Sequence, residues 1–150
     1  MANLTSLGIS QTSLVEKPTS LLRSKNFTKG VCVVKESELR TRAKTLALHI
    51  IAICDGVDTR KGRSVLVNQI IRSATSIGAN IHEANYASSK ADFINKFHIA
   101  LKECAETEYW IEMLMGCDAI TNETAHALLQ ECGVIRRMLA KSITTAKANK

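Results

Sequence analysis

Apolar residues recur at every third or fourth position in four separate stretches of the chain, beginning near residue 36. This spacing places them on one face of an α-helix, whereas a half-buried strand would alternate at every second position. The pattern predicts helices over about 36–57, 63–87, 89–117 and 122 to the C-terminus. The predicted inner faces include Leu39, Ala43, Leu46 and Ile50; Leu66, Ile70, Ile77 and Ile81; Phe93, Phe97, Cys104 and Ile111; and Leu128, Cys132, Ile135 and Leu139.

Short polar segments separate the four stretches and supply residues that start helices. Ser89 with Asp92 three positions later resembles a capping box, and Thr121 is a suitable N-cap for the last helix. The pair Asp58-Thr59 is expected to cap the second helix in the same way. Because these loops hold only about three to six residues, consecutive helices must run antiparallel. The expected fold is an all-α, antiparallel up-down-up-down four-helix bundle.

The second predicted helix carries two adjacent apolar stripes instead of one. A face this broad favours contact with several neighbouring helices and assembly with further copies of the chain. Gly78 lies within this helix, where glycine is less favourable than alanine by roughly 1 kcal/mol. We therefore expect another helix to approach the backbone closely at Gly78.

Residues 1–34 differ from the rest of the chain in being rich in Ser and Thr and free of a sustained helical period. They hold four cations against a single carboxylate, Glu16. Such a composition is found in an organellar transit peptide, and it also fits an expression leader, residues upstream of the true start codon or a disordered arm. The expected organisation is a disordered or loosely ordered extension over 1–34, followed by one bundle domain over 35–150.

The composition is that of a soluble helical protein. Apolar residues make up 45% of the chain and aromatic residues only 4%, with Ala, Ile and Leu prominent. No apolar run approaches the ~20 residues that a membrane-spanning helix needs. The five cysteines form no CxxC pair, which indicates reduced thiols in a cytoplasmic protein.

The sequence offers little catalytic or metal-binding chemistry. It has no Gly-rich phosphate loop and no grouping of a nucleophile with a base that spacing would bring together. A ferritin-like di-iron bundle needs two Glu-x-x-His motifs, and only Glu123 with His126 fits this pattern. We expect no enzymatic activity, no cofactor and no metal.

The chain has a net charge of +6, which favours an anionic partner. Its basic residues form two clusters, one around the start of the second helix and one on the last helix. Flexible cations of this kind can neutralise phosphates without reading base sequence, and a solvated helix face explains them equally well. The candidate nucleic-acid-binding residues are Arg60, Lys61, Arg63, Arg72, Arg136, Arg137 and Lys141.

Three polar residues lie close to the predicted apolar faces. Asn80 and Glu83 are three positions apart on the second helix, and Glu106 on the third is a candidate partner for them. Buried polar groups need hydrogen-bond partners. We expect these residues to form a structural network that fixes the register of the helices, in preference to a catalytic site.

Residues 69–84 resemble the signature of a bacterial family of four-helix-bundle proteins encoded in 23S ribosomal RNA intervening sequences. The residues that carry the resemblance at the family's spacing are Gln69, Arg72, Ser76, Ile77, Asn80, Ile81 and Glu83. The sequence departs from the family pattern at Ala84, where relatives have Gly, and at Lys102-Glu103, where they have Gly-Ser.

The resemblance implies a bundle that assembles as a ring-like homopentamer. Distant relatives are accessory proteins of diversity-generating retroelements, in which a basic pentameric barrel binds nucleic acid and a reverse transcriptase. The leading hypothesis is therefore a non-enzymatic, oligomeric bundle that binds RNA or DNA through basic residues. The alternative is a protein–protein adaptor or assembly scaffold that makes no direct contact with nucleic acid.

Overall fold

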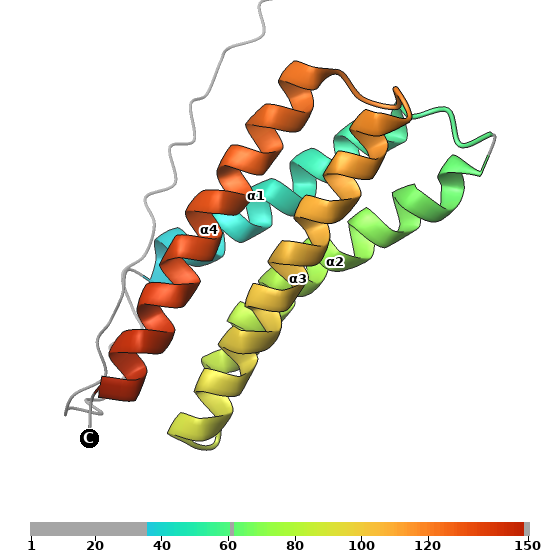
Figure 1. Cartoon of the computed structure of the whole chain (residues 1–150). Helices are drawn as coiled ribbons and strands as arrows, with labels where there is room; N and C mark the ends of the chain where they lie inside the picture. The colour runs from blue at the N-terminus through green and yellow to red at the C-terminus, as the bar shows by residue number, and fades with distance from the viewer. Residues whose placement is uncertain (1–35, 61, 149–150) are drawn as a thin grey trace, which may run out of the picture.

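Four α-helices make up most of the described chain. The computed structural model describes residues 36–60 and 62–148, and the predictions for residues 1–34 concern a segment outside them. In chain order the helices are α1 (Glu36–Asp55), α2 (Arg63–Ala84), α3 (Lys90–Gly116) and α4 (Asn122–Ala148) (Figure 1). No strand occurs among the described residues. The predicted all-α fold is confirmed, with α1 and α2 ending slightly earlier than predicted.

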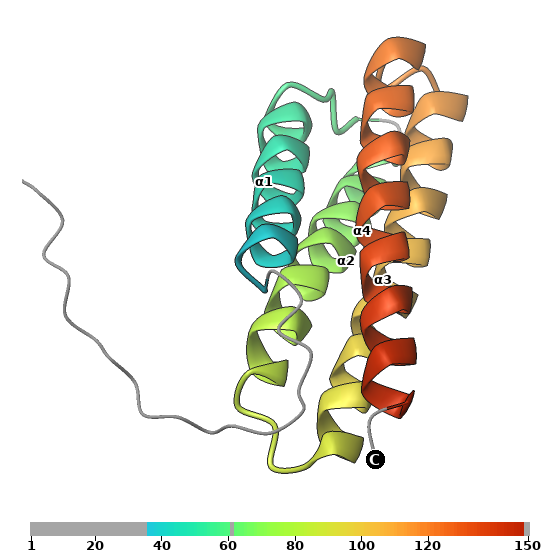
Figure 2. The ribbon, with the colours of Figure 1, turned by 90° about the vertical axis from the view of Figure 1, so that its left-hand side faces the viewer.

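Consecutive helices run antiparallel and pack side by side (Figures 1 and 2). The contact between α2 and α3 is the most extensive, and the contact between α1 and α4 is the smallest. In Figure 2 the first turn of α1 lies level with the middle of α4. None of the four described helices is long and apolar enough to cross a membrane.

The buried core takes residues from all four helices, at positions that the apolar period predicted. The largest fully buried hydrophobic side chains include Leu39, Leu46, Ile50, Ile70, Ile77, Ile111, Leu114, Ile135 and Leu139. Each of them contributes about 1.5–3 kcal/mol of stability by leaving water. Leu66 and Phe93 are only partly buried, because both lie near the starts of their helices, at the ends of the bundle.

Two of the predicted helix starts are confirmed. Ser89 Oγ accepts a hydrogen bond from the backbone N of Asp92 at 3.1 Å, and the Asp92 carboxylate accepts one from the backbone N of Ser88 at 3.0 Å. Thr121 Oγ1 accepts from the backbone N of Thr124 at 3.2 Å. These bonds satisfy amide groups that a helix start would otherwise leave unpaired.

The predicted cap of α2 is wrong. The N-cap of α2 is Gly62, with a φ of 80° and no side-chain hydrogen bond to the helix. Only glycine adopts this left-handed conformation without strain, so the backbone sets the start of α2. The carboxylate of Asp58 instead accepts hydrogen bonds from the backbone and side chain of Arg60, two residues later in the same loop.

Gly78 was predicted to permit a close helix approach, and it does face α1. A Cβ placed on Gly78 would lie 4.0 Å from the Cβ of Ala43, which is an ordinary van der Waals distance. The space beside Gly78 therefore admits a methyl group, and packing within the bundle does not require glycine there. The prediction that a closely approaching helix requires glycine at position 78 is therefore wrong for the helices of a single chain.

Candidate functional site

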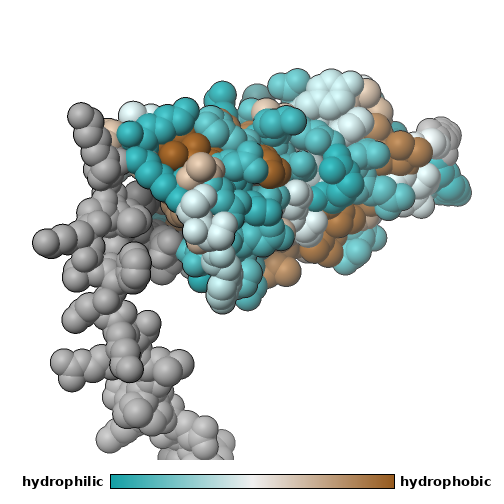
Figure 3. Space-filling view, turned by 90° about the horizontal axis from the view of Figure 1, so that it is seen from below, coloured by the Kyte–Doolittle hydropathy of each residue, from teal (hydrophilic) through white to brown (hydrophobic). Residues whose placement is uncertain are grey.

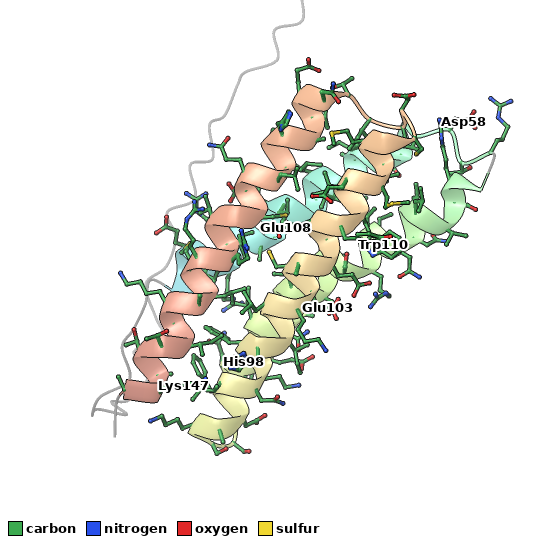
Figure 4. All side chains as sticks on the ribbon, in the orientation of Figure 1. Asp58, His98, Glu103, Glu108, Trp110 and Lys147 are labelled. Carbon is green, nitrogen blue, oxygen red and sulfur yellow. The ribbon has the colours of Figure 1, made fainter. Side chains whose placement is uncertain are left out.

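Arg72 on α2 lies in a polar cluster that joins α2 to α3. Its guanidinium donates hydrogen bonds to Glu106 and to Gln69, and the carboxylate of Glu103 lies 3.7 Å away. The indole Nε1 of Trp110 donates to the same Glu106 oxygen at 3.1 Å, from the side of α3 that faces α2 (Figure 4). The Trp110 hydrogen bond, together with the hydrogen bond and charge of Arg72, lowers the pKa of Glu106, so this carboxylate is ionised at neutral pH.

Next to this cluster, two hydroxyl groups meet in the buried interface of α2 and α3. The Oγ of Ser73 and the Oγ1 of Thr107 lie 2.9 Å apart, and both residues are fully buried. Each hydroxyl also lies within hydrogen-bonding distance of a carbonyl oxygen of its own helix. This pair was not predicted from the sequence, in which the hydroxyl of Ser73 within an apolar stripe was the available signal.

The structure does not bring Asn80, Glu83 and Glu106 into one network. Asn80 is half-buried and donates to the carbonyl oxygen of Ser76 at 2.9 Å, within its own helix. Glu83 is exposed and accepts a hydrogen bond from Lys96 on α3 at 2.6 Å. The register of the antiparallel pair explains the difference, because Lys96, and not Glu106, lies opposite Glu83.

The predicted basic cluster at the start of α2 is engaged by nearby groups. The Arg60 side chain donates to Asp58 at 2.8 Å, and Arg63 donates to the backbone oxygen of Cys117 at the end of α3. Lys61 lies outside the described residues. Arg72 lies against two carboxylates as well, so the three described cations of this cluster each contact a neighbouring group of the chain.

The second half of α4 carries the predicted cations that remain. Arg136 lies 3.5 Å from Glu108 of α3. Arg137 and Lys141 are exposed, one turn apart, and neither has a carboxylate partner among the described residues. Residues 136–148 include no acidic side chain, so no carboxylate in this part of the helix neutralises its positive charge. We call the surface around Arg137 and Lys141 the α4 basic face.

The Arg137 side chain of the α4 basic face lies back along its own helix, over the backbone of Gly133. Gly133 lies one turn before Arg137 and has no side chain, and a guanidinium nitrogen of Arg137 lies 3.4 Å from the place its Cβ would take. Figure 3 views the end of the bundle at which α4 ends, and hydrophilic residues dominate this surface. Lys147 lies at this end, and Asp58 lies at the opposite one (Figure 4).

A groove of about 570 Å³ runs between α1 and α2 on a different part of the surface. We call it the α1–α2 groove, and its lining includes Arg40, Lys44 and Leu48 of α1 and Thr75, Gly78 and His82 of α2. Arg40 donates to Nδ1 of His82, with a nitrogen–nitrogen distance of 2.9 Å. A guanidinium has no acceptor, so this contact needs Nδ1 without a proton. The groove was not predicted from the sequence, because its two sides come from separate helices.

The described residues assemble no evident nucleophile or metal site. The Sγ of Cys104 donates to the backbone oxygen of Cys132 at 3.4 Å. Contact with Cys104 and burial raise the pKa of the Cys132 thiol, so this thiol stays protonated at neutral pH. In the described ranges, no three His, Cys, Asp or Glu side chains are placed to hold a metal ion.

These contacts define a class of protein, an antiparallel four-helix bundle whose buried polar groups are structural and whose surface has a basic face. The chain belongs to the 23S rRNA-intervening sequence protein family, whose model matches residues 35–141. It is similar to a solved structure from Bacteroides thetaiotaomicron VPI-5482, a protein with unknown function from the S23 ribosomal protein family. The two chains are 39% identical with a TM-score of 0.70, over 74% of this chain and 99% of the other. No curated protein matches the chain.

Proposed function

We propose that the protein is a non-enzymatic, oligomeric bundle of the cytoplasm that binds RNA or other nucleic acid through the α4 basic face. The observation that carries the proposal is the exposure of Arg137 and Lys141 without a carboxylate partner among the described residues. Such cations can release the counterions of a phosphate backbone without first giving up an ion pair. The family also links this chain to ribosomal RNA intervening sequences.

The structure narrows the set of candidate residues. Arg60, Arg72 and Arg136 each contact a carboxylate of the chain, and Arg63 contacts a backbone oxygen. An exposed ion pair is worth only about 0–1 kcal/mol. These contacts therefore weaken the binding of phosphate by the three arginines but do not prevent it. The α4 basic face is therefore the first surface to test.

The test is binding of a fluorescent RNA to the full chain over a range of salt concentrations. The double variant Arg137→Glu/Lys141→Glu is expected to weaken binding at ~50 mM salt by tenfold or more, and to reduce the salt slope by about 0.7 for each lost single-strand contact. Lys44→Glu/Lys102→Glu is the matched control, because it also reverses two exposed charges, on α1 and α3, at residues outside the candidate set. Wild-type protein that does not bind RNA at ~50 mM salt would overturn the proposal.

The proposed oligomer is the homopentamer that family resemblance implies. An exposed apolar side chain outside the α1–α2 groove supports assembly, since Val65 exposes more than half of its surface. Sedimentation of the full chain as a monomer at micromolar concentration would contradict the ring.

A reverse transcriptase is the proposed protein partner where the gene lies beside one. The alternative role, a protein adaptor, is favoured by the α1–α2 groove.

A further inference from the structure

The α1–α2 groove has an apolar floor and a basic rim. Ala43 and Ala47 of α1 and Gly78 of α2 line its interior, and Leu48 lies exposed at its side. Arg40 and Lys44, exposed and one turn apart on α1, supply the positive charge. The groove lining includes no acidic residue. The occupant that fits has an apolar surface and negative charge.

The dimensions of the groove indicate the shape of this occupant. On α1 the lining runs from Arg40 to Ile51, which corresponds to about three helical turns, or roughly 16 Å. The methyl group of Ala47 and the absence of a side chain at Gly78 let another backbone come near, as small residues do between packed helices. A helix lying along two others is a common mode of peptide recognition.

We propose that the α1–α2 groove binds an acidic amphipathic helix of about three turns, presented by a partner protein. Small apolar residues of that helix pack on Ala47, Gly78 and the exposed Ala79, while Ala43 lies beneath them in the core. Its acidic residues pair with Arg40 and Lys44. The site is separate from the α4 basic face, because the groove is lined by α1 and α2 alone.

The glycine at position 78 supports the proposal independently of charge. In a helix interior, glycine is less stable than alanine by roughly 1 kcal/mol. Packing within the described chain does not require it, because a Cβ would meet Ala43 at an ordinary 4.0 Å. A groove floor that must stay open for another helix gives a reason for this residue. Locally unfavourable residues of this kind are expected at functional sites.

Other occupants fit the groove less well. Nucleic acid would find cations on the rim, but its bases would find an aliphatic floor with no Phe, Tyr or Trp in the lining. Residues 1–34 of this chain carry four cations and one carboxylate, so their charge has the same sign as the rim. A second copy of the chain remains a rival occupant, and sedimentation distinguishes it.

The experiment measures fluorescence anisotropy of labelled synthetic helices with the full chain at ~0.15 M salt. The probe has about three turns, with Ala and Leu on one face and Glu on both flanks. One control peptide has the same composition in scrambled order, and another replaces each Glu by Lys. We expect the acidic amphipathic probe to bind at least tenfold more tightly than either control.

Three variants locate the site. Gly78→Leu fills the floor and is expected to abolish probe binding, and Lys44→Glu is expected to weaken it tenfold or more. Lys102→Glu is the matched control for charge, because Lys102 is exposed on α3 and contributes nothing to the groove lining. Gly78→Ala is the variant to use if Gly78→Leu does not fold. It is expected to be more stable than the wild type and still to bind the probe helix more weakly.

Equal binding of probe and scrambled peptide, or probe binding that Gly78→Leu does not change, overturns the proposal. It is also overturned if the wild type sediments as an oligomer that Gly78→Leu converts to a monomer, because the groove is then covered by a second copy. RNA binding is measured in the same variants. We expect Arg137→Glu/Lys141→Glu to lose RNA binding and to bind the probe helix as the wild type does. Failure of the nucleic-acid proposal is therefore distinguishable from failure of the groove proposal.

Discussion

Replacing Gly78 by alanine is expected to stabilise the folded chain. The substitution removes the backbone freedom of glycine in the unfolded state and improves helix propensity by roughly 1 kcal/mol. The added methyl group lies 4.0 Å from the Cβ of Ala43, so it gains ordinary contact and creates no clash. Because Gly78 is only partly buried, the methyl adds little burial energy. The expected gain in the free energy of unfolding is therefore about 1 kcal/mol.

Urea unfolding followed by circular dichroism measures this gain. The midpoint should rise by roughly 0.5–1 M with an unchanged m-value, for an m of 1–2 kcal/mol/M. Gly133→Ala is the matched control, since it also replaces a helical glycine. There the new Cβ would lie 3.4 Å from a terminal nitrogen of Arg137, at the near limit of ordinary van der Waals contact, so we expect a gain no larger than that of Gly78→Ala.

A Gly78→Ala variant less stable than wild type by more than about 0.5 kcal/mol would refute this reasoning. Such a loss would mean that the space beside Gly78 is filled in solution. Repeating the measurement over a range of protein concentrations identifies the cause. A loss that grows with concentration would place a second copy of the chain against α2, since only an oligomer makes apparent stability depend on concentration.

The remaining predictions concern polar contacts of the bundle. Ser89→Ala removes the N-cap of α3 and should lower stability by about 1 kcal/mol in thermal unfolding, whereas an unchanged Tm would contradict the cap. Ser73→Ala and Thr107→Val should show a coupling energy of about 1 kcal/mol in a double-mutant cycle, and strict additivity would show that the hydroxyls do not interact. The pKa of Glu106 is lower in the folded state than in the unfolded state. Its contribution to stability is therefore fully present above the unfolded-state pKa and is lost as the pH falls through the folded-state pKa. Glu106→Gln should therefore flatten the acid limb of the stability profile, and an unchanged limb would contradict the ion pair.

The helix faces could be predicted from the sequence because burial in a bundle follows the period of the helix. Ile77 and Leu139 are fully buried in the structure, as their places in the stripes indicated. The start of α2 could not be predicted in the same way. It depends on the left-handed backbone of Gly62, and a nearby aspartate and threonine gave a stronger but misleading capping signal.

The candidate site could be predicted only in part, because the sequence does not give the register between helices. Arg72 and Arg137 look alike as exposed cations on amphipathic helices. Only the packing of α2 on α3 shows that Arg72 lies against Glu103 and Glu106, whereas Arg137 has no such partner among the described residues. The α1–α2 groove has the same origin, because Lys44 and Gly78 become neighbours only once the helices pack.

The signature stretch 69–84 takes on a physical meaning from the position of α2, which packs against both α1 and α3. On the side of α3, Arg72 and Ser73 make polar contacts that set register. On the side of α1, Gly78 keeps the floor of the α1–α2 groove open. Neither a buried hydroxyl nor a helical glycine maximises stability, so α2 departs from the most stable sequence on both sides. Contacts within the chain explain Arg72 and Ser73 on the side of α3. No contact within the described chain explains Gly78 on the side of α1, so the residue that still needs a reason lies at the α1–α2 groove and not in the core.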